Sequence, residues 1–231
     1  MKKIIYVSLL LSFTNIISQN VDYQGNGVRE MFIKQNSDIK GNDYIYNEWN
    51  SGTLVFNDSV FSKQDYLKYD VYRERVLIRN TKKPDEIIEI DNSTLTGFAI
   101  LERNRNLKHD FVKFKSFNFE GEAEDGFYEI VFNHQNVNYF IKKNSKVVFD
   151  PNRSEGSQTA NNLPFEFKDK TEYYIINNDG LYVNVRLKKK DIKLVLNKNT
   201  KLVDNYIKAN KIKFSKENDV MKLVNYYYAI L

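Results

Sequence analysis

Short runs of β-branched and aromatic residues, separated by Asn, Asp and Gly, recur about every ten residues over most of the chain. This spacing is typical of antiparallel strands joined by turns. In one run, the apolar residues Leu67, Tyr69 and Val71 alternate with Lys68 and Asp70. Because successive residues of a strand point to opposite faces, one face of this strand should lie in a core and the other in water. The sequence therefore predicts a mainly β protein.

The clearest single strand is predicted over residues 111–119, which place aromatic side chains on both faces. Two hairpins are predicted, with turns at 133–136 and 177–180, and the second turn ends in Asp-Gly, a strong hairpin signal. Residues 150–170 are polar and contain two prolines, so we expect a mobile loop, with a lid over one sheet face as the alternative. The spacing leaves a β-meander, a sandwich and a curled half-barrel open.

The hydrophobic period changes in residues 188–231, where apolar side chains recur three and four positions apart, as in amphipathic helices. Asn199, Thr200 and Ser215 are suitable N-cap residues for two of these helices. One stripe of the last helix contains Val220, Leu223, Val224, Tyr227 and Leu231. We expect this helical tail to fold back on the β-rich body, and a separate partner-binding module is the alternative.

The first 18 residues have the layout of a secretory signal peptide. Lys2 and Lys3 precede an apolar run, and Ser18 forms a cleavage boundary before Gln19. The sequence thus predicts three parts: a signal peptide at 1–18, a β-rich domain at 19–187 and packed helices at 188–231. The mature chain would be exported to the periplasm or the cell surface and would contain no transmembrane segment.

The charge balance argues against a nucleic-acid-binding protein. The chain of 231 residues has a formal net charge of +5, of which the predicted signal peptide carries two positive charges. Nucleic-acid binding needs a concentrated basic stripe, whereas here the densest run is Lys188-Lys189-Lys190, which we interpret as a solvated helix start. The absence of cysteine excludes disulfides and thiolate chemistry.

Catalytic motifs are missing from the sequence. It contains no nucleophile elbow, phosphate loop or dinucleotide fingerprint. The two histidines, His109 and His134, lie 25 residues apart and lack a second ligand at metal-site spacing, so we place both at strand edges or turns on the surface. We assign no catalytic residue and no cofactor, and we expect a protein that is not an enzyme.

One acidic run offers a weak metal candidate, with carboxylates at Glu120, Glu122, Glu124 and Asp125. Calcium binds six to eight oxygen ligands, and alternating carboxylates can supply several of them. A helix–loop–helix calcium site, however, needs Gly at its sixth position and Glu at its twelfth, where this run has Asp125 and Val131. We therefore favour an acidic turn without a metal.

Three segments carry a resemblance to a known family: residues 44–56 (YIYNEWNSGTLVF), 67–70 (LKYD) and 203–228. In these segments the chain resembles an uncharacterised family of exported proteins from Bacteroidetes, mainly flavobacteria, with a β-rich body and a helical tail. The resemblance covers most of the mature chain. It implies the fold and export, and it transfers no functional residues.

Three functions remain open at this stage. The first is a non-enzymatic binding or accessory protein of the periplasm or cell surface, which would present an aromatic-rich β-surface to an apolar ligand or to an envelope protein. The second is a structural subunit of an envelope assembly. The third is a hydrolase with an unrecognised carboxylate site.

Overall fold

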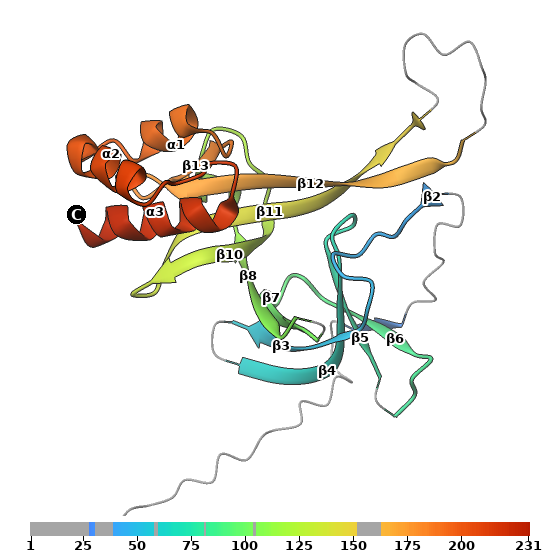
Figure 1. The fold of residues 1–231 in the computed structure, drawn as a ribbon. Coiled ribbons are helices and arrows are strands. Elements are labelled where there is room, and N and C mark those ends of the chain that lie inside the picture. The colour runs from blue at the N-terminus through green and yellow to red at the C-terminus, as the bar shows by residue number, and fades with distance from the viewer. Residues whose placement is uncertain (1–27, 31–38, 58–59, 81, 104, 152–162) are drawn as a thin grey trace, which may run out of the picture.

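The computed structural model describes residues 28–30, 39–57, 60–80, 82–103, 105–151 and 163–231. The predicted signal peptide at 1–18 and the centre of the predicted mobile loop lie outside these residues. The described chain consists of thirteen strands, one 3₁₀ turn and three helices (Figure 1). It is a mainly β structure that ends in helices, which confirms the predicted fold class.

The strands and helices follow one another along the chain in an order that puts all helices last. The strands are β1 (Val28–Glu30), β2 (Ile39–Lys40), β3 (Asn50–Phe56), β4 (Val60–Asp70), β5 (Arg75–Arg79), β6 (Ile87–Ile90), β7 (Leu95–Glu102), β8 (Leu107–Phe114), β9 (Phe119–Glu120), β10 (Gly126–His134), β11 (Val137–Phe149), β12 (Phe165–Ile176) and β13 (Tyr182–Val185). The 3₁₀ turn is Ser116–Asn118, and the helices are α1 (Lys189–Val195), α2 (Thr200–Ala209) and α3 (Glu217–Ala229).

All described strands belong to one open sheet, in the order β1-β6-β5-β4-β3-β7-β8-β10-β11-β12-β13-β9, with β2 paired to β12. The β3–β7 pair lies in the middle of the sheet. Strands β4, β5 and β6 follow on the β3 side, and β8 and β10 to β13 follow on the β7 side. The β12–β2 and β13–β9 pairs are parallel, so the sheet is mixed rather than purely antiparallel. A single sheet excludes the two-sheet sandwich among the three architectures that the sequence left open.

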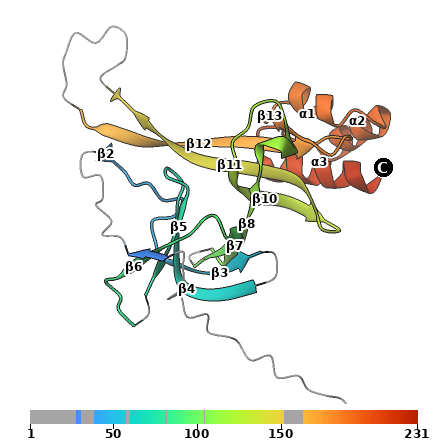
Figure 2. The same ribbon diagram turned by 180° about the vertical axis from the view of Figure 1, so that it is seen from behind.

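The strands β3 to β8 curl around an apolar cluster, which we call the first core (Figures 1 and 2). Leu67, Tyr69 and Val71 are buried in it, as their alternation predicts. The rings of Phe98 and Phe111 stack with centroids 4.6 Å apart, and Phe127 of β10 meets Phe98 edge to face. Aromatic pairs of this kind stabilise a core beyond the area they bury.

The three helices cover one end of β10 to β13 and form a second core there (Figure 2). Val220, Leu223, Val224 and Tyr227 are fully buried against residues of this sheet end, among them Phe140, Ile175 and Val185. The apolar stripe of α3 therefore packs on the β-rich body, as predicted. Leu231 is exposed and does not belong to the packed stripe. No helix in the described residues is long and apolar enough to span a membrane.

The opposite face of β10 to β12 carries a third core of Tyr128, Ile141 and Tyr174, together with Phe119 and Tyr182. At their other end, β11 and β12 extend away from the helices, and β2 pairs with β12 there (Figure 1). Most of the fully buried large side chains are aromatic or leucine, and they fill these three cores. Much of the aromatic content is therefore structural.

The predicted strand over residues 111–119 is wrong beyond Phe114. Asp125 accepts a hydrogen bond from the Ser116 N–H (2.7 Å), and the Asn118 side chain accepts one from the Lys115 N–H (2.9 Å). These contacts turn the chain at the 3₁₀ turn, so Phe117 is 76% exposed instead of sharing the face of Phe111.

The predicted loop over residues 150–170 is wrong in its last part, because β12 begins at Phe165 and pairs with β11. Ser215 is not the N-cap of the last helix, since α3 begins at Glu217 after Lys216. Instead, Asp219 in the first turn accepts the Lys213 N–H (2.9 Å) and closes the preceding turn. Both hairpin predictions are confirmed, and Gly180 adopts the positive φ of +82° that the Asp-Gly turn requires.

Candidate functional site

The acidic run at Glu120, Glu122, Glu124 and Asp125 is exposed, and its carboxylates do not converge. Asp125 accepts hydrogen bonds from the Ser116 backbone and from Lys115, which hold its pKa below the ordinary value. Glu120 accepts a bond from the Asn177 side chain (2.9 Å). In the described part of the chain, no three His, Cys, Asp or Glu side chains are arranged to hold a metal ion.

Two shallow cavities of about 190 and 240 Å³ lie on the described surface. The first is on the β3, β7 and β8 strands, and the second lies where Ile45 and Val71 meet Asn144 and Thr171. Ligand pockets usually measure about 300–1,000 Å³. Neither of these two cavities is large enough to bury a lipid chain.

A line of charged side chains, which we call the polar belt, separates the first core from the second on one sheet face. Its members are Glu102, His109, Glu129, Lys142 and Glu217. On β10, Glu129 follows Phe127 of the first core and precedes Val131, which packs on the second. Lys142 is directly opposite Glu129 in the β10–β11 register. The belt thus crosses the strands from β7 to α3.

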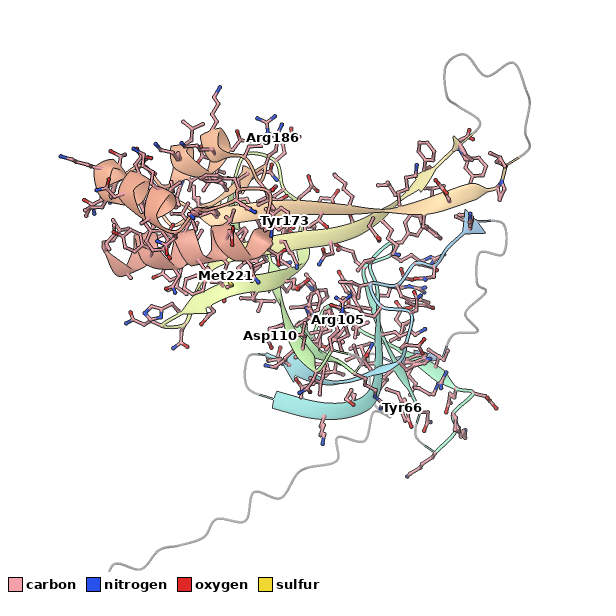
Figure 3. The ribbon with its side chains drawn as sticks, in the orientation of Figure 1. Tyr66, Arg105, Asp110, Tyr173, Arg186 and Met221 are labelled. Atoms are coloured by element: carbon pink, nitrogen blue, oxygen red, sulfur yellow. The ribbon has the colours of Figure 1, made fainter. Side chains whose placement is uncertain are left out.

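Glu129 is the centre of the belt and is almost completely buried. Its carboxylate lies 2.8 Å from His109 Nδ1 and 3.1 Å from Lys142 Nζ, and the Asn144 amide donates a hydrogen bond to it at 2.6 Å. Lys142 also contacts Glu217 of α3 at 3.1 Å. Figure 3 shows Tyr173, which faces Lys142 in the β11–β12 register, beside this helix. The belt therefore ties α3 to the sheet.

The pKa values within the belt follow from these contacts. The hydrogen bond to Glu129 raises the pKa of His109 and outweighs its burial. Burial pushes the pKa of Glu129 up, but His109 and Lys142 lower it below the ordinary value. Burial together with the charges of Glu129 and Glu102 raises the pKa of Tyr46, whose ring lies 5.3 Å from that of His109. These shifts favour an ionised, mutually compensated network.

His109 was expected at a strand edge on the surface, and this prediction is wrong. The residue lies within β8, between β7 and β10, with its side chain 19% exposed. Its Nε2 atom is buried without a hydrogen-bond partner among the described residues, and so is the Oε2 atom of Glu102, 3.6 Å away. His134 lies at the exposed end of β10, as expected.

A second constellation lies on the opposite, outer face of β4 and β5, and we call it the cation–aromatic row. Three aromatic rings and three basic side chains alternate along it, in the order Tyr44, Lys68, Trp49, Arg79, Tyr66 and Arg103. The ring centroids lie 4.4 to 6.0 Å from the cations. In Figure 3, Tyr66 is on the curled half of the sheet, away from the helices.

Strand alternation explains why the row is on the outer face. Leu67 and Tyr69 point into the first core, so Tyr66 and Lys68 point outward. Lys68 pairs with Leu77 on β5, which puts Arg79, two residues further along, diagonally across the hairpin. Tyr66 is 37% exposed.

The segment before β3 brings Tyr44 and Trp49 to this face. Hydrogen bonds from the Ile45 N–H to the Tyr69 carbonyl (3.1 Å) and from the Val71 N–H to the Asp43 carbonyl (3.0 Å) hold the segment along β4. The buried side chain of Asn50 donates to the Glu48 carbonyl (2.9 Å) and accepts the Arg103 N–H (3.4 Å). Asn50 therefore links the backbone next to Trp49 with that of Arg103.

A buried ion network next to the row fixes the same segment. Asp70 was expected in water, yet it is completely buried and lies 3.0 Å from Arg73 and 2.8 Å from Arg75. Arg73 also contacts Asp43. A buried carboxylate needs such partners because desolvation of an unpaired charge is costly. The carboxylates and guanidinium groups of this network pair with one another.

Among the described residues, Lys68 and Arg79 take part in no salt bridge. Burial, together with the nearby charge of Arg79, lowers the pKa of Lys68, against the opposing charges of Glu48 and Asp43. The Nε–H of Arg79 is buried and has no hydrogen-bond partner among the described residues. Aromatic faces rather than carboxylates position these cations, which leaves their positive charge available to a ligand.

This row was not predicted from the sequence. The alternation of Tyr66 and Lys68, together with Arg79 on the next strand, could have indicated part of it. Trp49 and Arg103 join these residues only through the fold. The chain matches no protein-family model, no curated protein and no solved structure at a significant level. The candidate site is therefore argued from the geometry alone.

Proposed function

We propose that this protein is an exported, non-enzymatic binding component of the bacterial envelope and that it holds an anionic ligand on the cation–aromatic row. The observation that carries the proposal is that Lys68 and Arg79 are held between aromatic rings on an outer sheet face and take part in no salt bridge among the described residues. Cations positioned in this way need no reorganisation to meet an anion.

Three further features support the proposal. The layout of residues 1–18 favours export. The charges of the polar belt, which would be the alternative site of chemistry, compensate one another. Much of the aromatic content fills the three cores, whereas the row keeps aromatic rings on an outer face, where Tyr66 is 37% exposed.

Native mass spectrometry of the protein purified from its own envelope tests this function. We expect the wild type to carry a bound anionic species and the Lys68→Gln/Arg79→Gln variant to lose it. The Lys189→Gln/Lys190→Gln variant removes two charges from exposed positions at the start of α1 and should keep the ligand. A wild type that carries a partner chain and no small ligand would instead establish the structural-subunit alternative.

A further inference from the structure

The length of the cation–aromatic row indicates a ligand with repeated charges. Its six side chains come from the segment before β3, from β4 and β5, and from the residue after β7. A single small anion would engage one or two of the three cations. An extended polyanion can meet Lys68, Arg79 and Arg103 in succession.

The rings of the row are already occupied by cations. Lys68 and Arg79 both lie over Trp49, at 5.3 and 4.6 Å, and Arg79 and Arg103 both lie over Tyr66, at 6.0 and 5.8 Å. Proteins that bind single-stranded nucleic acids stack successive bases on aromatic rings, and here the cations compete for the same ring faces. The row therefore favours a ligand that is recognised through hydrogen bonds and charge rather than through base stacking.

The groups that the row presents are guanidinium and ammonium N–H donors. A guanidinium matches a carboxylate in a planar, two-bond geometry, and its hydrogen bonds to a charged acceptor are strong. The Arg79 guanidinium lies over the rings of Trp49 and Tyr66 and takes part in no salt bridge among the described residues. A chain of sugars with a carboxylate on each residue supplies acceptors in a repeating order and adds hydroxyl groups between them.

We propose that the row binds an acidic polysaccharide, with the carboxylates of successive uronic acid residues at Lys68, Arg79 and Arg103. This inference rests on the proposed function and specifies its ligand. Asn50 acts as a positioning residue, because it joins the backbone beside Trp49 to that of Arg103 at the far end of the row.

Trp49 provides a direct readout, because it is the single tryptophan of the chain. We would titrate the full-length mature protein with an oligogalacturonate and follow Trp49 fluorescence, with calorimetry as the measurement for the variants. The fully methyl-esterified oligomer is the matched ligand control, since it keeps the sugar backbone and loses the charge. We expect a saturable change with the acid oligomer, weakening as salt rises, and none with the ester.

The variants locate the binding on the protein. Lys68→Gln/Arg79→Gln should weaken the affinity for the acid oligomer by at least about tenfold, because two charge-assisted contacts are lost. Lys189→Gln/Lys190→Gln removes the same net charge and should leave the affinity unchanged. An equal loss of affinity in both variants would mean that binding depends only on net charge, and it would overturn the inference.

The failure of this inference can be distinguished from the failure of the proposed function. Binding of oligothymidylate or of an acidic peptide, dependent on Lys68 and Arg79 and without binding of the oligogalacturonate, would overturn the polysaccharide assignment and keep an anion-binding protein. If none of the three probes binds and no anionic species is carried by the protein from the envelope, the proposed function itself is wrong.

Discussion

At the scale of single residues, His109 has the most consequential environment, because it joins Glu129 in a half-buried ion pair. A histidine whose pKa is raised by folding stabilises the folded state while it is protonated. This contribution is complete below the pKa of about 6.5 in the unfolded chain and is lost as pH rises through the higher pKa of the folded state. The stability advantage of the wild type over His109→Gln should therefore shrink with rising pH.

Urea unfolding of the wild type and of His109→Gln, at pH values from about 5 to about 9, measures this trend. His134→Gln is the matched control, because His134 is exposed and forms no salt bridge in the described part of the chain. The groups that face His109 are Glu102, Glu129, Lys142 and Tyr46. A difference between wild type and His109→Gln that stays constant over this range would contradict the assignment.

Residue environments were the least predictable part of the structure. Leu67, Tyr69 and Val71 are buried as their alternation predicts, but the intervening Asp70 is buried as well. Its burial depends on Arg73 and Arg75 in the following turn and strand. The alternation of residues along a strand predicts the face on which each side chain lies. It does not predict which other parts of the chain cover that face.

At the scale of elements, α3 shows how the helical tail is stabilised. Leu223 is completely buried in the second core, and a short helix in water depends on such burial. We expect Leu223→Ala to lower the free energy of unfolding by about 2–5 kcal/mol, the usual cost of a buried leucine truncation. Leu194→Ala in α1 removes a leucine that is 67% exposed. This substitution should change the free energy of unfolding by less than about 0.5 kcal/mol.

Thermal or urea denaturation of the two variants decides between the packed tail and an independent module. Equal stabilities of Leu223→Ala and Leu194→Ala would mean that the apolar stripe of α3 is not part of the folded core. The comparison keeps residue type and helical context the same, so it isolates burial.

The elements themselves were mostly predictable, and the failures have a common cause. The 177–180 hairpin was predictable because Asp-Gly encodes the turn locally, with Gly180 at positive φ. The strand predicted over 111–119 breaks because Asp125, from the following loop, binds the Ser116 N–H. The start of β12 at Phe165 likewise depends on pairing with β11. Local signals predicted the local structures, and long-range contacts decided the rest.

At the scale of the whole molecule, one curled sheet holds three cores and leaves two polar constellations on its faces. The polar belt is compensated and joins α3 to the sheet. In the cation–aromatic row, Lys68 and Arg79 take part in no salt bridge among the described residues, and the row forms only because the segment before β3 runs beside β4. The sequence predicted the sheet and the helices, but the row needs the side chains of four separate segments.

The central claim is that Lys68 and Arg79, which take part in no salt bridge among the described residues, give the row a local positive potential. Collisional quenching of Trp49 fluorescence tests it directly, since the single tryptophan lies between Lys68 and Arg79. A local positive potential concentrates anions and repels cations, so at low salt iodide should quench Trp49 much more strongly than caesium, and Lys68→Gln/Arg79→Gln should reduce that difference. Equal quenching by iodide and caesium in the wild type would contradict the account.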